Sequence, residues 1–173
     1  MKKTLLTTTL LILPALVAPA QVRLVTVKVD GLACAFCAYG LQKGLKRVEG
    51  VKDVKVYVDA GKAELRFKEG APAGLAEIGP AVKKAGYTPA EITVEVTGRL
   101  IDWNGKPALA IDGAAEKLLL DGGDALRRMS AGRNPPSAAS LVTVVGTLEQ
   151  INPPQHHGHP LTLHIKEIRV AEG

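Results

Sequence analysis

The order of hydrophobic patterns between residues 23 and 92 limits this chain to few folds. Runs that alternate apolar and polar residues predict strands, and apolar residues at a spacing of three or four predict helices. In chain order the patterns are a strand at 25–29, a helix at 41–48, a hairpin of strands at 54–58 and 63–67, a helix at 75–85 and a strand from 92. The order βαββαβ predicts a ferredoxin-like domain, with both helices on one face of a four-stranded antiparallel sheet.

The chain beyond residue 93 has a different pattern, made mainly of strands. We expect strands at 94–103, 107–111, 116–120, 141–148 and 161–170, and a short helix at 124–129. Five strands with a helix after the third is the order of an OB fold, a small, partly open barrel, and a small sandwich is the weaker alternative. No flexible linker separates the halves. We therefore predict an α+β chain with a ferredoxin-like domain at 21–93 and an OB-like barrel at 94–173.

The first twenty residues have the features of a secretory signal. Lys2 and Lys3 precede an uncharged apolar run, and the small residues Ala18-Pro19-Ala20 follow it. The apolar run is shorter than a membrane span, so we expect cleavage after Ala20 rather than stable membrane insertion. The mature protein would be periplasmic or secreted.

Composition excludes several functional classes. Loss of the two lysines of the signal lowers the formal charge from +5 to +3, and aromatic residues make up only 3% of the chain. Nucleic-acid binding relies on basic grooves and aromatic stacking, so we expect none. The sequence contains no nucleophile elbow and no glycine-rich phosphate loop, so we do not expect an enzyme.

The chain has two cysteines, and they lie three residues apart, at Cys34 and Cys37, between the first predicted strand and helix. At a helix start, backbone N–H groups and the helix dipole favour the thiolate. Two thiolates suit the soft ion Cu(I), and Hg(II) by the same argument. A closed zinc site needs four ligands, so Zn(II) would require histidines or a partner.

With this pair, the chain resembles the heavy-metal-associated domain family of copper chaperones, copper-ATPase modules and the periplasmic mercuric-ion-binding protein. The resemblance covers residues 22–95 and includes Gly31 to Cys37, the segment 48–51 and the segment Ala85-Gly86-Tyr87. It implies that Cys34 and Cys37 bind the metal and that Tyr87 lies near the metal loop. A tyrosine at a strand edge that packs on the helix is an equal alternative for Tyr87. At position 32 the family has Met, whose side chain supports the loop by packing under it. This chain has Leu32 there, a residue of similar volume that can take the same role.

The sequence suggests three hypotheses for the function of the chain, and only one of them is a metal carrier. A Cys-x-x-Cys pair in an exported protein also suits a thiol–disulfide oxidoreductase, although the neighbouring residues lack the tryptophan and the Gly-Pro typical of that class. A local structural disulfide is another alternative for the pair, although so short a loop removes little entropy from the unfolded chain. A third hypothesis is an adaptor protein whose barrel docks a partner. The first hypothesis is a metal carrier that passes its ion, by ligand exchange, to a metal-transporting ATPase or another metal-acceptor protein.

Three histidines form a second candidate metal site. His156, His157 and His159 lie between proline residues in the loop before the last predicted strand. Neutral imidazoles bind Cu(II), Zn(II) or Ni(II), but a solvated polar loop explains the same residues. His164 alternates with apolar residues, so we expect it on the outer face of that strand.

Overall fold

Strands dominate the structure and form one continuous sheet. The computed structural model describes residues 21–112, 117–131, 140–149 and 160–171. The predicted signal lies outside these residues, and none of the described helices has the length and apolar character that a membrane crossing requires. The elements are β1 (Gln21–Asp30), α1 (Ala35–Leu45), β2 (Val51–Tyr57), β3 (Lys62–Phe67), a 3-10 turn η1 (Leu75–Glu77), α2 (Ile78–Lys84), β4 (Thr88–Trp103), β5 (Lys106–Ala110), β6 (Leu118–Asp121), α3 (Gly123–Ser130), β7 (Leu141–Leu148) and β8 (Leu161–Val170).

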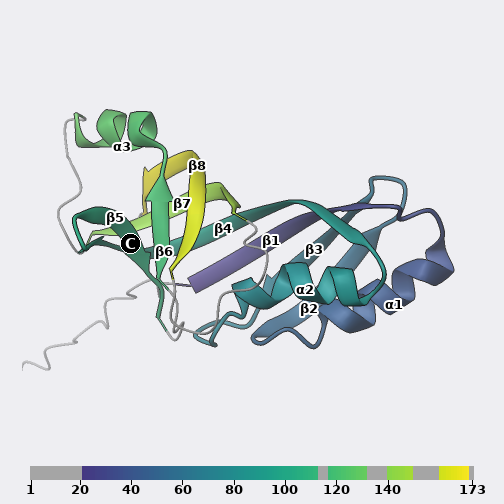
Figure 1. Cartoon of the computed structure of the whole chain (residues 1–173). Helices are drawn as coiled ribbons and strands as arrows, with labels where there is room; N and C mark the ends of the chain where they lie inside the picture. Colours follow the sequence, from purple (N-terminus) through teal and green to yellow (C-terminus); the bar gives the residue numbers. More distant parts are fainter. Residues whose placement is uncertain (1–20, 113–116, 132–139, 150–159, 172–173) are drawn as a thin grey trace, which may run out of the picture.

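The first half has the predicted βαββαβ order. Strands β2, β3, β1 and β4 lie side by side in that order, and each pair is antiparallel. Helices α1 and α2 lie together on one face of these strands (Figure 1). Alternate residues of β1, such as Val25 and Val27, point to this face and are fully buried. The ferredoxin-like arrangement is therefore confirmed for this part of the chain.

Each helix buries one apolar stripe against the sheet. Leu41 and Leu45 of α1 and Ile78 and Val82 of α2 have no exposed surface. Removal of each such side chain from water contributes on the order of 2 kcal/mol to folding. The spacing of three or four residues seen in the sequence thus identifies the buried face of each helix.

The long strand β4 extends the sheet beyond the four strands that the sequence predicts. The sheet does not stop at β4, because residues Thr93–Thr97 pair with β1 on one edge and with β7 on the other. Further along, Arg99–Trp103 pair with β5. Asn104 and Gly105 then reverse the chain with φ angles of 54° and 76°, the positive values that a two-residue hairpin turn of type I′ requires. One strand therefore belongs to both halves of the chain.

The second half closes on itself like a barrel. Strands β4, β5, β6, β8 and β7 follow one another, and the β4–β7 pairing completes the ring. The β6–β8 pair is parallel and the other pairs in the ring are antiparallel. Helix α3 lies between β6 and β7 in sequence, as expected. Assignment of this ring to the OB fold stays a prediction, and so does a domain boundary at residues 93/94, which falls within β4.

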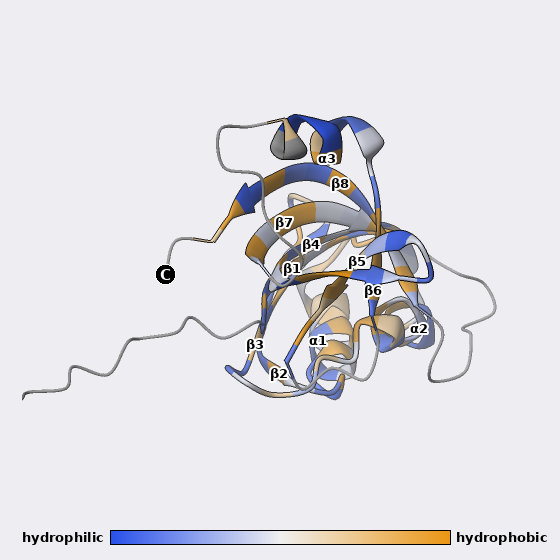
Figure 2. Cartoon of the chain, turned by 90° about the vertical axis from the view of Figure 1, so that its left-hand side faces the viewer, coloured by the Kyte–Doolittle hydropathy of each residue, from blue (hydrophilic) through white to orange (hydrophobic). Residues whose placement is uncertain are grey.

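The two halves share one hydrophobic core. A single cluster of buried side chains extends from Val25 beneath the helices, through Val94 and Val96 of β4, to Val144 and Leu163 in the ring. Figure 2 shows hydrophobic and hydrophilic residues alternating along β8. Unfolding of one half would therefore expose apolar surface of the other.

Polar contacts cross the same junction. The hydroxyls of Thr97 on β4 and Thr143 on β7 are both buried and lie 2.9 Å apart. On the sheet surface, the carboxylate of Glu91 on β4 accepts hydrogen bonds from Lys166 of β8 and Lys28 of β1. The bond from Lys166, with further bonds from Thr93 and Lys28, lowers the pKa of Glu91 from 4.5 to about 2. Charge pairing thus ties the ring to the ferredoxin-like sheet.

The threonine pair gives a test of the junction. Thr97→Val should lower the free energy of unfolding by about 1–3 kcal/mol, because the buried Thr143 hydroxyl loses its partner. The double variant Thr97→Val/Thr143→Val should lose much less than twice that amount, since no polar group stays unsatisfied. Urea unfolding measures both, with the exposed Thr88→Val as a control. Additive losses in the double variant would contradict the coupling.

Glu91 predicts a pH dependence of stability. Its pKa is lowered in the folded state, so its ion pairs stabilise the fold above about pH 4.5 and this contribution is lost as the pH falls toward 2. Glu91→Gln should therefore lower Tm at neutral pH, and the difference from wild type should shrink between pH 4.5 and 2. Glu69→Gln, in the exposed turn after β3, is the control. A difference that stays constant with pH would contradict the assignment.

Candidate metal centre

The cysteine loop connects the end of β1 to the start of α1. Gly31 turns the chain out of β1 with a φ angle of 83°, a conformation that glycine adopts without strain. Leu32 then places its side chain in the core, with 8% of its surface exposed. Burial of this apolar side chain therefore fixes the loop to the core, at the position where the family resemblance predicts a packing residue. A supporting role of Leu32 in metal binding stays a prediction.

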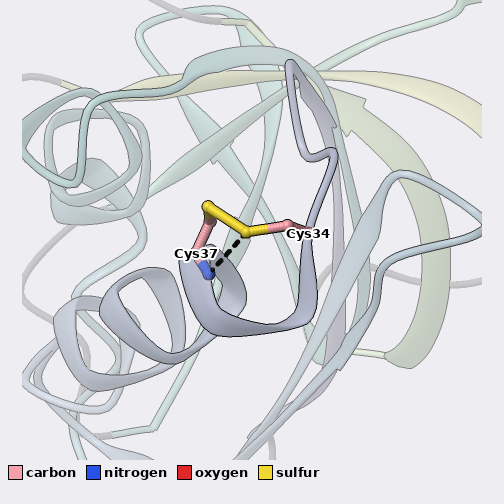
Figure 3. The surroundings of a disulfide bond; sticks show 2 residues. All are labelled: Cys34 and Cys37. Carbon is pink, nitrogen blue, oxygen red and sulfur yellow. Dashed lines mark hydrogen bonds between the residues drawn. A yellow bond between two sulfur atoms is a disulfide. The ribbon is translucent and has the colours of Figure 1, made fainter.

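Cys34 caps the amino terminus of α1. Its backbone is extended, and its sulfur accepts a hydrogen bond from the backbone N–H of Cys37 at 3.1 Å. The Cα atoms of the two cysteines are 5.4 Å apart, and the sulfurs are joined in a disulfide (Figure 3). The spacing of three residues thus brings both sulfurs to one point at the helix start, as the sequence predicts.

The surface around the pair is open and aromatic. Cys34 is half-buried, Cys37 is exposed, and Phe36 between them has 91% of its surface exposed. Tyr39, the fifth residue of α1, is 65% exposed. These two rings therefore lie on the solvent-exposed side of the loop and of α1, next to the sulfurs. The sequence pattern did not identify these two residues, because it does not determine which side chains near the start of the helix point to solvent.

The chemistry of the pair depends on its redox state. In the disulfide, neither sulfur is a thiolate ligand. After reduction, the same backbone geometry presents two soft donors on one side of a short loop. The donor set fits an ion that accepts two thiolates and leaves room for a third ligand from outside.

Tyr87 has a clear structural position beyond the second helix. Gly86 donates its N–H to the carbonyl of Lys83, and Tyr87 donates its N–H to the carbonyl of Val82, which together form a Schellman cap on α2. The side chain of Tyr87 is half-buried against the core. Thr88, the next residue, pairs with Asp30 at the start of the cysteine loop. The backbone of Tyr87 therefore lies beside the loop, while contact with a metal stays a prediction.

Of the four histidines, the structure describes only His164. His156, His157 and His159 lie outside the described residues. His164 has an exposed side chain, and its Nδ1 atom is 2.9 Å from a carboxylate oxygen of Asp121 on the neighbouring strand. Within the described ranges, no three His, Cys, Asp or Glu side chains gather as a metal site would require.

Comparison with known proteins identifies the family of the half of the chain that bears the cysteines. Residues 26–88 match the heavy-metal-associated domain. The mercuric transport protein periplasmic component of Serratia marcescens is 33% identical over 79 residues, which are 44% of this chain and 86% of that protein. The chain belongs to the heavy-metal-associated family. Its first half is therefore a metal-binding domain of a type that takes soft heavy metals.

Two further proteins match a similar share of this chain. The protein of the same name from Shigella flexneri is 37% identical over 79 residues, again 44% of this chain and 86% of that protein. The crystal structure of oxidized MerP from Ralstonia metallidurans CH34 covers 40% of this chain and 94% of its own, at 28% identity and a TM-score of 0.36.

Redox state should control metal binding by this heavy-metal-associated domain. We expect the disulfide form to have no accessible thiols and no tight metal binding, and the reduced form to bind one ion per chain, because only thiolates are strong ligands for soft ions. Thiol titration and competition with a chromophoric Cu(I) chelator measure both properties in the same sample. Equal affinity of the oxidised and reduced forms would place the ligands elsewhere.

Proposed function

We propose that this protein is a periplasmic carrier that holds Cu(I) or Hg(II) between Cys34 and Cys37 and passes the ion to a metal-acceptor protein. The observation that carries the proposal is the convergence of both sulfurs at an exposed helix start. Membership of the heavy-metal-associated family supports it independently. The role needs no chemical change of a substrate, so we propose that the protein is not an enzyme.

The donor set favours soft ions over zinc. Two thiolates satisfy Cu(I) or Hg(II), which accept low coordination numbers, whereas a closed zinc site needs four ligands. The mercuric transport function in the names of the relatives from Serratia and Shigella supports Hg(II). Zn(II) would need additional donors from a partner or from the histidine loop.

Transfer would occur by ligand exchange at the exposed side of the loop. A thiolate of the acceptor enters the coordination sphere, one cysteine of this chain leaves, and the second follows. The exposure of Cys37 supports approach of a partner sulfur to the ion from that side. We propose a metal-transporting ATPase or another thiolate-bearing acceptor as the partner. The signal-like residues 1–20 and the periplasmic relatives support export to the periplasm.

One observation favours a second function. The disulfide between Cys34 and Cys37 is the oxidised state of a thiol–disulfide exchange pair. An oxidoreductase using this pair would accelerate reduction of insulin by a small dithiol, while a metal carrier would not. The ring of β4 to β8, which we propose to be an OB-like barrel, would serve in either case to dock a further protein.

The cysteine and histidine sites can be separated by mutation. Cys34→Ser and Cys37→Ser should each abolish tight Cu(I) and Hg(II) binding by reduced protein, because a lone thiolate forms no chelate. The triple variant His156→Ser/His157→Ser/His159→Ser should keep the Cu(I) affinity of wild type, since imidazole competes poorly with a thiolate pair for this ion. Chelator competition measures the affinities. Unchanged affinity in both cysteine variants would refute the proposed function.

A further inference from the structure

A pocket lies at the start of β1, at the opposite end of that strand from the cysteine loop. Its volume is about 390 Å³, which falls within the range of small-molecule sites. The described residues that line it belong to strands β1, β2 and β3 and to the turn after β3. The pocket is therefore separate from the metal loop and from the surface that α1 and α2 form.

Two irregularities in the sheet bring cations to this pocket. Strand β1 holds one residue more than its partner β4 at Arg23, and β2 holds one residue more than β3 at Lys52. A β-bulge of this kind bends the strand and redirects the side chain of the extra residue. Arg23 and Lys52 lie on different strands, yet both line the same pocket. The two bulges thus place two positive charges around one concavity.

The pocket has four basic lining residues in all. Arg23, Lys52, Lys55 and Arg66 line it and are exposed. A guanidinium nitrogen of Arg23 is 3.8 Å from a carboxylate oxygen of Glu95, which is beyond hydrogen-bond distance. In the described part of the chain, the other three form no ion pair. Their charges are therefore available to an anion from outside.

Acidic and apolar residues complete the lining. Asp53 lies 4.0 Å from Lys46, which is not among the lining residues, and Glu69 is exposed in the turn after β3. Four cations and two carboxylates leave the lining with a net charge of +2. Val22 and Phe67 are buried and give the pocket an apolar base. The pocket therefore suits a ligand that has both a doubly charged anionic group and an apolar part.

We propose that this pocket binds a small organic phosphate monoester. Such a group carries a charge of about −1.5 to −2 at neutral pH, which matches the excess of positive charge in the lining. Its terminal oxygens point in different directions, so they can meet cations from three strands at once. The planar guanidinium groups of Arg23 and Arg66 can each donate two hydrogen bonds to a phosphate. The organic part would cover Val22 and Phe67.

Other anions fit the pocket less well. A dicarboxylate has the same charge, but it divides this charge between two flat groups at its two ends. Inorganic phosphate lacks an organic part and would leave the apolar base uncovered. A phosphomonoester lipid headgroup has the same chemistry as a soluble ester, but it would have to enter a concavity from a flat membrane surface. Each of these anions is therefore an arm of the experiment.

The test uses the full mature chain with glycerol phosphate as the soluble monoester. Calorimetric titration gives Kd at low and high salt, and backbone NMR shifts locate the binding site. Glycerol, succinate and inorganic phosphate are titrated in parallel. Vesicles of phosphatidic acid in phosphatidylcholine, and of phosphatidylcholine alone, test the lipid source of the same phosphate group.

Two pairs of variants assign the contacts. Arg23→Gln/Arg66→Gln should weaken binding of glycerol phosphate about tenfold or more, because both forked donors are lost. Lys52→Gln/Lys55→Gln removes the same amount of charge from the other side of the pocket and should also weaken binding. Thermal unfolding verifies that each variant folds, and either pair alone decides the question if the other does not fold.

Control variants separate this site from the rest of the protein. Lys106→Gln/Arg128→Gln, on β5 and α3, removes two exposed cations outside the pocket and should bind glycerol phosphate like wild type. Cys34→Ser/Cys37→Ser should also bind it like wild type while it loses metal. The pocket variants should keep the metal affinity of wild type. Failure of the phosphate site and failure of the metal site are therefore distinguishable.

The outcomes are distinct. Salt-sensitive binding of glycerol phosphate, with shifts at the start of β1 and β2 and at the end of β3, and with loss in the pocket variants only, supports the proposal. Binding to phosphatidic acid vesicles in addition would extend it to a lipid source. The proposal is overturned by no binding, by equal binding of succinate or inorganic phosphate, by shifts elsewhere, or by unchanged affinity in the pocket variants. Binding to vesicles without binding to the soluble ester would also overturn it.

Discussion

The structure depends on a single strand that hydrogen-bonds on both edges. Residues Thr93–Thr97 of β4 pair with β1 and β7 at once, so the ferredoxin-like sheet and the closed ring are parts of one hydrogen-bonded sheet. The valines at 94 and 96 are fully buried in the core that both halves share. Relative motion of the halves would break main-chain hydrogen bonds and expose apolar surface, which a flexible linker would not require.

The same sheet fixes the position of the metal loop. Pairing of Asp30 with Thr88 fixes the end of β1, Leu32 anchors the loop in the core, and α1 begins directly after Cys34. The local chain geometry thus brings the two sulfurs together. The same geometry allows both a disulfide and a soft-ion chelate, which explains why carrier and oxidoreductase hypotheses arise from one motif.

Local patterns predicted the elements well, and long-range pairing was harder. Valine alternation and leucine spacing located β1 and α1, and the two cysteines identified the loop. The closure of β4 on β7 joins residues such as Thr97 and Thr143 that are far apart in sequence, and no short-range pattern encodes it. The exposure of Phe36 depends on tertiary packing, so composition could not reveal it.

The direction of β1 has a consequence for how the protein reaches its partners. The strand starts at Gln21, opposite Thr97 beside the ring, and ends at Asp30 beside the cysteines (Figure 1). Ten extended residues span about 33 Å. An acceptor bound at the sulfurs and a second protein docked on the ring would therefore be separated by about the length of this strand.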